Sequence, residues 1–285
     1  MIRSKEIALN LHSITIKAKQ WGNSEGIKVL ALHGWMDNLA SFDPLAPLLK
    51  NLNLVAVDLP GHGQSDHVPE GSGLHFIDLV PNVLDIADRL GWRQFVLLGH
   101  SMGAAVATLV AGCVPERIQK MILLEGLGPL SQTAEETPDR LLKSIQQEAK
   151  IRQRSRRLFP SIQNAISARM AGSDLDRNSA EILVKRALVK QGEHCVFTHD
   201  QRLRSASRIR LTEEMVLAFF QRILCPTLFI EAEDGWPFPE DLVQKRLSSI
   251  KDLHHEVIAG GHHVHMTHPH KIAEYVNAFL SPVNN

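Results

Sequence analysis

The sequence predicts an α/β fold with a mostly parallel central sheet. Short apolar runs without apolar–polar alternation are typical of strands that are buried on both faces of such a sheet. Helical spacing of apolar residues lies between several of these runs, and repeated alternation of strand and helix predicts right-handed crossovers. The expected strands are KVLALHG (28–34), LNLVAVDLPG (52–61), QFVLLGHS (94–101), KMILLEG (120–126), PTLFIEA (226–232) and HHEVIAGG (254–261). The expected helices cover 76–91, 102–113, 239–250 and 270–280.

The chain is expected to open with an antiparallel hairpin over residues 6–19. Apolar side chains occupy every second position in each half of this segment, which is the period of a strand. They are Ile7, Leu9 and Leu11 in the first half, and Ile14, Ile16 and Ala18 in the second.

Composition excludes several classes of protein. The 285 residues include 31 Lys and Arg and 31 Asp and Glu, and a zero net charge argues against nucleic acid or an anionic membrane as partner. No stretch approaches the roughly 18 consecutive apolar residues that span a bilayer, and the N-terminus lacks the pattern of a secretory signal. Cys113, Cys195 and Cys225 form no C-x-x-C pair, so they predict neither a disulfide framework nor a zinc ribbon. We therefore expect a cytoplasmic protein.

One long insertion interrupts the alternation of strands and helices. Helical patterns dominate residues 129–222, which predicts a cap inserted into a core formed by 1–128 and 223–285. The insertion has 17 Lys and Arg against 11 Asp and Glu, whereas the rest of the chain has 14 against 20. The zero net charge is therefore a cancellation between a basic insertion and an acidic core.

A dense basic cluster lies inside this insertion. Five of eight consecutive residues are basic, and an apolar helical face precedes them by one or two turns. The basic residues are Lys150, Arg152, Arg154, Arg156 and Arg157; the apolar ones are Leu141, Leu142, Ile145 and Ala149. Two interpretations stay open here, a solvated outer helix of the cap or a patch that binds an anion or a membrane surface.

The strongest functional signal is the motif GHSMG at residues 99–103, between a predicted strand and a predicted helix. Such a sharp turn forces the central serine into a strained backbone conformation, and Gly99 and Gly103 permit close backbone approach. The turn lifts the Ser101 hydroxyl clear of the sheet, beside free N–H groups that favour developing negative charge. Ser101 is therefore the candidate nucleophile.

A serine hydroxyl needs a base to take its proton during attack, and His262 is the candidate. It lies in GGHHVHM (260–266), directly after the last predicted strand. Seven of the 15 histidines cluster around it, but there is no H-E-x-x-H motif and no cysteine pair, so we expect no metal. We expect His263, His265 and His268 to pack or lie at the surface, with His265 also a candidate to line the site.

Two backbone N–H groups are candidates for an oxyanion hole. Acyl transfer through a tetrahedral intermediate needs donors directed at the developing oxyanion. One is the N–H of Met102, directly after the candidate nucleophile. The other is the N–H of Trp35 in HGWM (33–36), where Gly34 permits a tight turn after a predicted strand.

Together these motifs resemble the α/β-hydrolase superfamily, and more narrowly its serine hydrolase-like members. The motifs, in the order typical of the family, are HGWMDN (33–38), DLPGHGQSD (58–66), GHSMGA (99–104), LLEGLGP (123–129) and GGHHVHM (260–266). The resemblance implies an eight-stranded, mostly parallel sheet flanked by helices, a helical cap after strand six, and no cofactor. It also implies a triad of nucleophile, acid and base, with Ser101 as the nucleophile and His262 as the base.

The acid of this triad has two candidates. Many α/β-hydrolases carry it after strand seven as the Asp of a Gly-x-x-Asp stretch, but counting from Pro226 that position holds Gly235. Asp234 lies one residue earlier. Some haloalkane dehalogenases instead carry a Glu at the end of strand six, where this chain has Glu125. Either carboxylate could orient His262 and stabilise its imidazolium form, and Glu125 is the favoured one.

The leading hypothesis is a serine hydrolase that cleaves a small carboxylic ester, thioester or lactone through an acyl-enzyme. Epoxide hydrolases and haloalkane dehalogenases use an Asp nucleophile, and Ser101 argues against both. Epoxide opening also uses cap tyrosines, whereas the single tyrosine, Tyr275, lies in the C-terminal helix. The alternatives are hydrolysis of a C–C bond in a diketone acid and a ligand-binding protein without catalysis. The sequence does not predict an oligomeric state.

Overall fold

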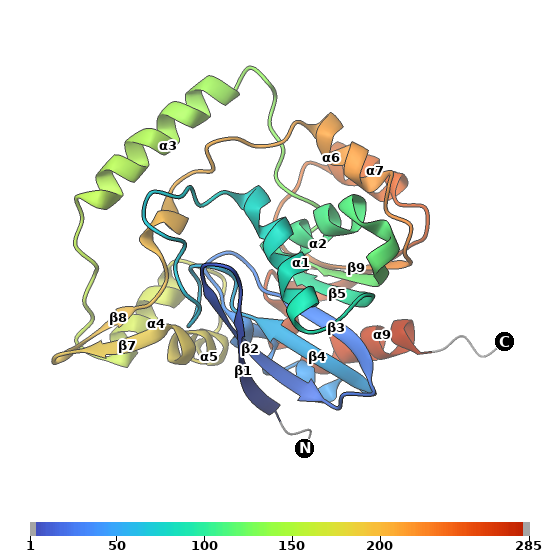
Figure 1. The fold of residues 1–285 in the computed structure, drawn as a ribbon, viewed down its shortest axis with the longest axis horizontal. Coiled ribbons are helices and arrows are strands. Elements are labelled where there is room, and N and C mark those ends of the chain that lie inside the picture. The colour runs from blue at the N-terminus through green and yellow to red at the C-terminus, as the bar shows by residue number, and fades with distance from the viewer. Residues whose placement is uncertain (1–3, 282–285) are drawn as a thin grey trace.

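A computed structural model describes residues 4–281 of this chain. Its centre is an eight-stranded sheet in the order β1-β2-β4-β3-β5-β6-β9-β10 (Figure 1). The strands are β1 Ser4–Asn10, β2 Thr15–Gly22, β3 Ile27–Leu32, β4 Leu52–Val57, β5 Phe95–His100, β6 Ile118–Leu124, β9 Thr227–Asp234 and β10 Leu253–Gly261. β2 pairs antiparallel with β1 and with β4, and every other neighbouring pair is parallel. The predicted hairpin and the mostly parallel sheet are both present.

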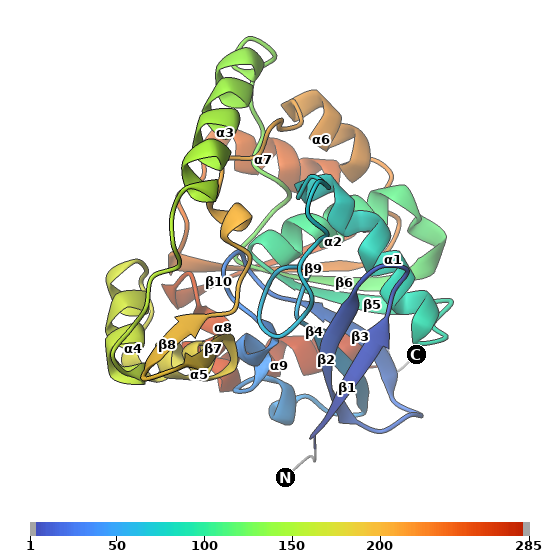
Figure 2. The ribbon, with the colours of Figure 1, turned by 60° about the vertical axis from the view of Figure 1, so that its left-hand side comes forward.

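Helices cover both faces of the sheet (Figures 1 and 2). The α-helices of the sheet layers are α1 Leu79–Arg89, α2 Met102–Cys113, α6 Glu213–Phe220, α7 Glu240–Ser249, α8 Val264–Thr267 and α9 Pro269–Leu280. The short 3-10 helices are η1 Leu39–Phe42, η2 Ala46–Leu48, η3 Phe76–Asp78, η4 Pro115–Arg117 and η5 Gln201–Arg204. α1, α2 and α6 pack on one face, and α9 packs on the other. Within residues 4–281, no helix combines the length and apolar character needed to cross a bilayer.

Apolar and polar residues do not alternate in the central strands because helices cover both faces of the sheet. In β3, Leu30 and Leu32 belong to the apolar cluster under α1 and α2, whereas Val29 and Ala31 belong to the cluster under α9. Successive side chains of a strand point to opposite faces, so a strand covered on both sides is apolar at most positions.

The segment between β6 and β9 leaves the sheet and returns to it. It contains α3 Thr137–Arg152, α4 Ile162–Ala171, α5 Arg177–Ala187 and a hairpin of β7 Leu188–Gln191 with β8 His194–Phe197. The hairpin is short and mostly exposed, so no apolar period marked it in the sequence. α4 and α5 share a small apolar cluster with Met266 of the core. α6 packs on α2, where Val216 and Phe220 are buried in the core.

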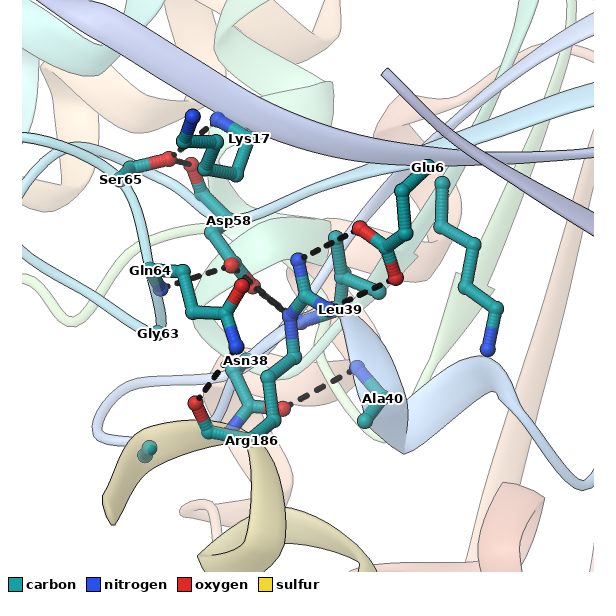
Figure 3. Close-up of polar contacts among 12 residues, drawn as sticks. Glu6, Lys17, Asn38, Leu39, Ala40, Asp58, Gly63, Gln64, Ser65 and Arg186 are labelled. Carbon is teal, nitrogen blue, oxygen red and sulfur yellow. Dashed lines mark hydrogen bonds and ion pairs between the residues drawn. The ribbon is translucent and has the colours of Figure 1, made fainter. Parts of the chain in front are cut away.

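A buried ion pair joins this segment to the sheet (Figure 3). The guanidinium Nε of Arg186, in α5, lies 2.9 Å from Oδ2 of Asp58, and its Nη1 lies 2.9 Å from Oε1 of Glu6. The Asp58 carboxylate also accepts the backbone N–H groups of Leu39 and Gln64, each at 2.9 Å. The Asp58 side chain is 0% exposed and that of Arg186 is 9% exposed. Asp58 begins the DLPGHGQSD motif, so this motif anchors the inserted segment.

Removing Arg186 should therefore destabilise the protein strongly. Arg186→Leu leaves the Asp58 carboxylate buried without a cation, and we expect the free energy of unfolding to fall by about 3 kcal/mol. Lys185→Ala is the matched control, because Lys185 pairs with Glu181 on the exposed side of the same helix. Its effect should stay within about 0.5 kcal/mol. Urea unfolding measures both values, and equal losses in the two variants would contradict the anchoring role.

Candidate active site

Ser101 occupies a strained turn between β5 and α2. Its φ of 51° lies in the left-handed region that non-glycine residues rarely adopt. A Cβ atom at Gly99 would collide with the backbone of Ala104, and one at Gly103 would collide with the carbonyl of Leu32. Both glycines are therefore required by close backbone packing, as the sequence motif predicts. The turn presents the Ser101 hydroxyl at the first turn of α2.

The structure brings Ser101, His262 and Glu125 into one hydrogen-bonded chain. Nε2 of His262 lies 2.9 Å from Oγ of Ser101, and Nδ1 of His262 lies 3.0 Å from Oε2 of Glu125. Each residue directly follows the last residue of a parallel strand, namely β5, β10 and β6. Parallel strands end at one edge of the sheet, so three residues far apart in the sequence converge there.

Backbone hydrogen bonds hold the Glu125 side chain in place beside His262. Its side chain is buried, and its φ of 53° is also in the left-handed region. The carboxylate accepts the backbone N–H of Ala232 through Oε1, and that of Trp236 through Oε2 at 3.1 Å. These backbone donors leave Oε2 directed at His262, which fixes the ring so that its Nε2 faces Ser101.

In the described structure, one carboxylate, that of Glu125, lies beside the Nδ1 atom of His262. A Cβ atom at Gly235 would overlap the Glu125 carboxylate, so an Asp at that position would need the volume that Glu125 fills. Asp234 is exposed, and within residues 4–281 no hydrogen bond joins its carboxylate to His262. Glycine at position 235 therefore leaves the space that the Glu125 carboxylate fills.

Two unused backbone donors border the same cavity as Ser101. Trp35, after β3, and Met102, at the start of α2, line it together with Ser101 and His262. Neither of their backbone N–H groups donates to an acceptor in the described part of the chain. The indole of Trp35 donates to the carbonyl of Leu203 at 2.9 Å, so the inserted segment also holds this loop. Both groups are free to receive a ligand oxygen.

The cavity is large and lies between the sheet edge and the inserted segment. Its volume is about 1610 Å³. The loops after β3, β5, β6, β9 and β10 form its floor, and residues of α3, α4, α5 and 201–211 form its other walls. A volume above the roughly 300–1,000 Å³ of ordinary ligand pockets accommodates an extended substrate.

A network that the sequence did not predict holds the His262 loop against the inserted segment. Asp174, between α4 and α5, accepts the backbone N–H of His262 at 2.8 Å and contacts Nδ1 of His263 at 3.0 Å. Nε2 of His263 lies 3.2 Å from Asp37, and Asp37 accepts from Arg169 of α4 at 2.5 Å. Asp37 belongs to the HGWMDN motif, but nothing in the sequence around Asp174 marks its role.

The network keeps His263 protonated. Burial alone would lower its pKa, but the carboxylates of Asp37 and Asp174 raise it to about 9. The hydrogen bond from His263 in turn lowers the pKa of Asp174 to about 2. A cation between two carboxylates therefore links the core to the inserted segment at neutral pH.

His265 packs in the interior, as the main expectation from the sequence had it, and is not among the residues that line the cavity. It is fully buried, with its ring centroid 4.1 Å from that of His100, and burial lowers its pKa to about 3. His100 is also buried, and its Nε2 lies 2.8 Å from the backbone carbonyl of His262. Within residues 4–281, no group of three or more His, Cys, Asp or Glu side chains is arranged to hold a metal ion.

Comparison with known proteins identifies the family of the chain. A family model for the α/β hydrolase fold matches residues 28–269. The chain belongs to the α/β-hydrolase family. This α/β-hydrolase is 31% identical to a serine hydrolase-like protein of Dictyostelium discoideum, over 97% of this chain and 81% of that one. It is 30% identical to serine hydrolase-like protein 2 of Homo sapiens, over 93% of this chain and 90% of the relative.

Solved structures share the fold over nearly the whole α/β-hydrolase. A hypothetical protein of Pseudomonas aeruginosa superposes with a TM-score of 0.92 at 35% identity, covering 98% of this chain and all of that one. The thioesterase domain of the curacin biosynthetic pathway gives a TM-score of 0.86 at 22% identity, with coverages of 97% and 99%. An esterase of Mycobacterium tuberculosis gives 0.73 at 19% identity, with coverages of 98% and 91%. The last two likenesses show the fold alone.

The His263 network should make stability depend on pH in a defined direction. Because the pKa of His263 is raised from 6.5 to about 9, its stabilisation is complete below about pH 6.5 and is lost as the pH rises through 9. We expect His263→Gln to lower the free energy of unfolding by on the order of 1–3 kcal/mol at pH 6, and by much less at pH 9.5.

Urea unfolding of wild type and variant across pH 5–10 measures this difference. Comparing the two proteins cancels buried histidines such as His265, whose lowered pKa makes stability rise with pH instead. A difference that stays constant from pH 6 to pH 9.5 would show that the folded protein does not hold His263 as a cation.

Proposed function

We propose that this α/β-hydrolase is a serine hydrolase that cleaves a small carboxylic ester, a thioester or a lactone. The observation that carries the proposal is the hydrogen-bonded chain from Ser101 through His262 to Glu125. An activated serine needs a base within hydrogen-bond reach and a third group that orients the base, and these distances meet both requirements. The serine hydrolase-like relatives and the hydrolase fold support the same reaction class.

In the proposed acylation, His262 Nε2 takes the hydroxyl proton while Ser101 Oγ attacks the carbonyl carbon. The carbonyl oxygen becomes an oxyanion, which accepts the backbone N–H groups of Trp35 and Met102. Glu125 stabilises the imidazolium form of His262 without becoming protonated. His262 then gives its proton to the departing alcohol or thiol, and the acyl group stays bound to Ser101.

Deacylation uses the same groups with water as the nucleophile. His262 takes a proton from water as its oxygen attacks the acyl carbon, and the second oxyanion occupies the same hole. Collapse returns the proton to Ser101 Oγ and releases a carboxylic acid. No cofactor enters this scheme. Residues 129–222 act as a cap that shapes the pocket, on a core of 1–128 and 223–285.

The two alternatives use the same fold and the same cavity. Hydrolysis of a C–C bond in a diketone acid would use Ser101 and His262, with basic cap residues holding the substrate carboxylate. A ligand-binding protein without catalysis would keep the fold and the cavity but form no acyl-enzyme. Labelling by a fluorophosphonate separates the ligand-binding protein from the two hydrolases, because only the hydrolases need an activated serine.

A fluorophosphonate probe should label Ser101 covalently. Such a probe reacts with a serine that has an adjacent base, and the 2.9 Å contact with His262 places that base. Mass spectrometry of the digested protein should locate one adduct on residues 99–103, and Ser101→Ala should abolish it. An unlabelled wild-type protein that is folded by circular dichroism would overturn the nucleophile and favour the ligand-binding alternative.

Substitution of the two carboxylates should identify the acid. We expect Glu125→Gln to lower kcat by about 10³–10⁴-fold, because the amide disturbs the tautomer and orientation of His262. Asp234→Asn should leave kcat nearly unchanged, since Asp234 is exposed and does not contact His262. Steady-state hydrolysis of p-nitrophenyl acetate measures both variants. Equal and mild losses would remove Glu125 from the mechanism.

A further inference from the structure

Helix α3 faces the cavity with its basic side. A surface helix normally turns its apolar stripe inward and its charged side outward. Here the cavity-lining positions of α3 and its C-terminal extension recur at helical spacing and are mainly basic. They are Arg140, Lys143, Gln147, Lys150 and Ile151 in α3, and Arg154, Ser155 and Arg157 after its end. Leu141, Leu142 and Ile145 instead remain 42%, 54% and 55% exposed. α3 lies at the outer margin of the molecule in both ribbon views (Figures 1 and 2).

A half-buried arginine extends this basic side. Arg210 lines the same cavity and makes no hydrogen bond or ion pair with any residue from 4 to 281. Burial lowers its pKa, and the neighbouring guanidinium of Arg140 lowers it further. Within the described residues, the guanidinium of Arg140 donates to the neutral side chain of Gln132 and to no carboxylate. Arg140 and Arg210 line the same cavity and repel each other, and the nearby carboxylate of Glu136 offsets this repulsion only in part, because the pKa of Arg210 stays lowered. A further anion bound there would stabilise the pair.

The other charges of the cavity do not neutralise this group. Of the four acidic residues that line the cavity, Glu125 contacts His262, and Asp37 and Asp174 contact His263. The fourth, Asp234 at the end of β9, forms no ion pair with any basic residue of the described chain. Nearby arginines that the fold itself uses do have carboxylate partners: Arg169 binds Asp37, and Arg208 binds Glu148 through two hydrogen bonds. Lys143, Lys150 and Arg154 form no ion pair within the described residues. We call Arg140, Lys143, Lys150, Arg154 and Arg210 the basic face.

We propose that the basic face is an anion subsite for the phosphate group of the substrate. The proposal rests on the proposed function, since it makes the substrate an ester or thioester that carries a phosphate. A single carboxylate would need one arginine, whereas a phosphate monoester or diphosphate carries more charge and more acceptor oxygens. The cavity volume of about 1610 Å³ leaves room for both the phosphate-bearing part and the acyl part.

Binding of inorganic pyrophosphate tests the subsite without any turnover. The measurement uses the full chain with Ser101→Ala, by titration calorimetry at low ionic strength. We expect the combined Arg140→Gln and Arg210→Gln variant to bind pyrophosphate at least about tenfold more weakly. Arg152→Gln is the matched control, because Arg152 lies on α3 but outside the cavity and is largely exposed.

The outcomes are distinct. Loss of affinity in the double variant with retention in Arg152→Gln supports the subsite. Absence of pyrophosphate binding, or equal affinity in all three proteins, overturns it. Circular dichroism spectra and unfolding curves show whether the double variant is folded, and the single substitution Arg210→Gln repeats the test in the least altered protein.

Kinetics with matched substrate pairs distinguish the possible sources of the phosphate. One pair is acetyl-coenzyme A with the neutral S-acetyl-N-acetylcysteamine, and the other is a lysophosphatidic acid with the corresponding monoacylglycerol. In at least one pair, the phosphate-bearing member should have the higher kcat/KM. In the double variant, the ratio of the two kcat/KM values should fall about tenfold. Preference for the neutral member in both pairs would contradict the proposal.

Failure of the subsite and failure of the hydrolase function give different results. Neutral esters hydrolysed by a protein that does not bind pyrophosphate would remove the subsite and leave the hydrolase. Pyrophosphate bound by a protein that hydrolyses neither pair and resists fluorophosphonate would remove the hydrolase and leave the subsite. Added salt provides a further check, since it should raise KM for the phosphate-bearing substrate far more than for its neutral partner.

Discussion

The site depends on the sharp turn that joins β5 to α2 at Ser101. The backbone there has a φ of 51°, and two glycines are required because the turn packs against Leu32 and Ala104. Such strain persists only where the surrounding structure enforces it. The parallel strands on either side of β5 supply that support, and the Ser101 N–H donates to the carbonyl of Leu124 at 2.9 Å. The turn places one hydroxyl beside His262 and beside the first free N–H of α2.

Around this turn, the carboxylate beside His262 illustrates how one volume can be filled from either of two strands. Glu125 reaches it from the end of β6, with its own backbone in the left-handed region. Gly235 lies where an Asp would reach it from the end of β9, and any side chain there would overlap Glu125. Orientation of His262 requires a carboxylate beside its Nδ1 atom, and a residue after either strand can supply it.

The inserted segment uses its positive charge in two ways. Arg186 and Arg169 bind the carboxylates of Asp58 and Asp37, so they hold the segment to the sheet and to the loop that follows β3. Asp174 of this segment forms an ion pair with His263, which lies in the His262 loop. Arg210 has no such partner in the described chain and faces the cavity with the basic side of α3. Part of the excess charge of the segment therefore faces the cavity that Ser101 lines.

The features that could be predicted from the sequence depend on short-range geometry. The central strands, the order of the motifs, the turn at Ser101 and the position of His262 follow from local sterics and from the apolar demands of a sheet covered on both faces. These features are encoded within a few residues of each position. The family resemblance extended them to the eight-stranded, mostly parallel sheet that the structure has.

Which distant residues meet depends on how the elements pack in three dimensions. The geometry places Glu125 rather than Asp234 beside His262, buries His265 away from the cavity, and joins Asp174 to the His262 loop 88 positions later. It also turns the charged side of α3 inward, whereas the sequence pattern indicated only an apolar face followed by a basic cluster. These contacts link segments that are far apart in the chain, and their distances depend on how the strands and the inserted segment pack. No local pattern records them, because the same side chains at the same spacing would fit several packings.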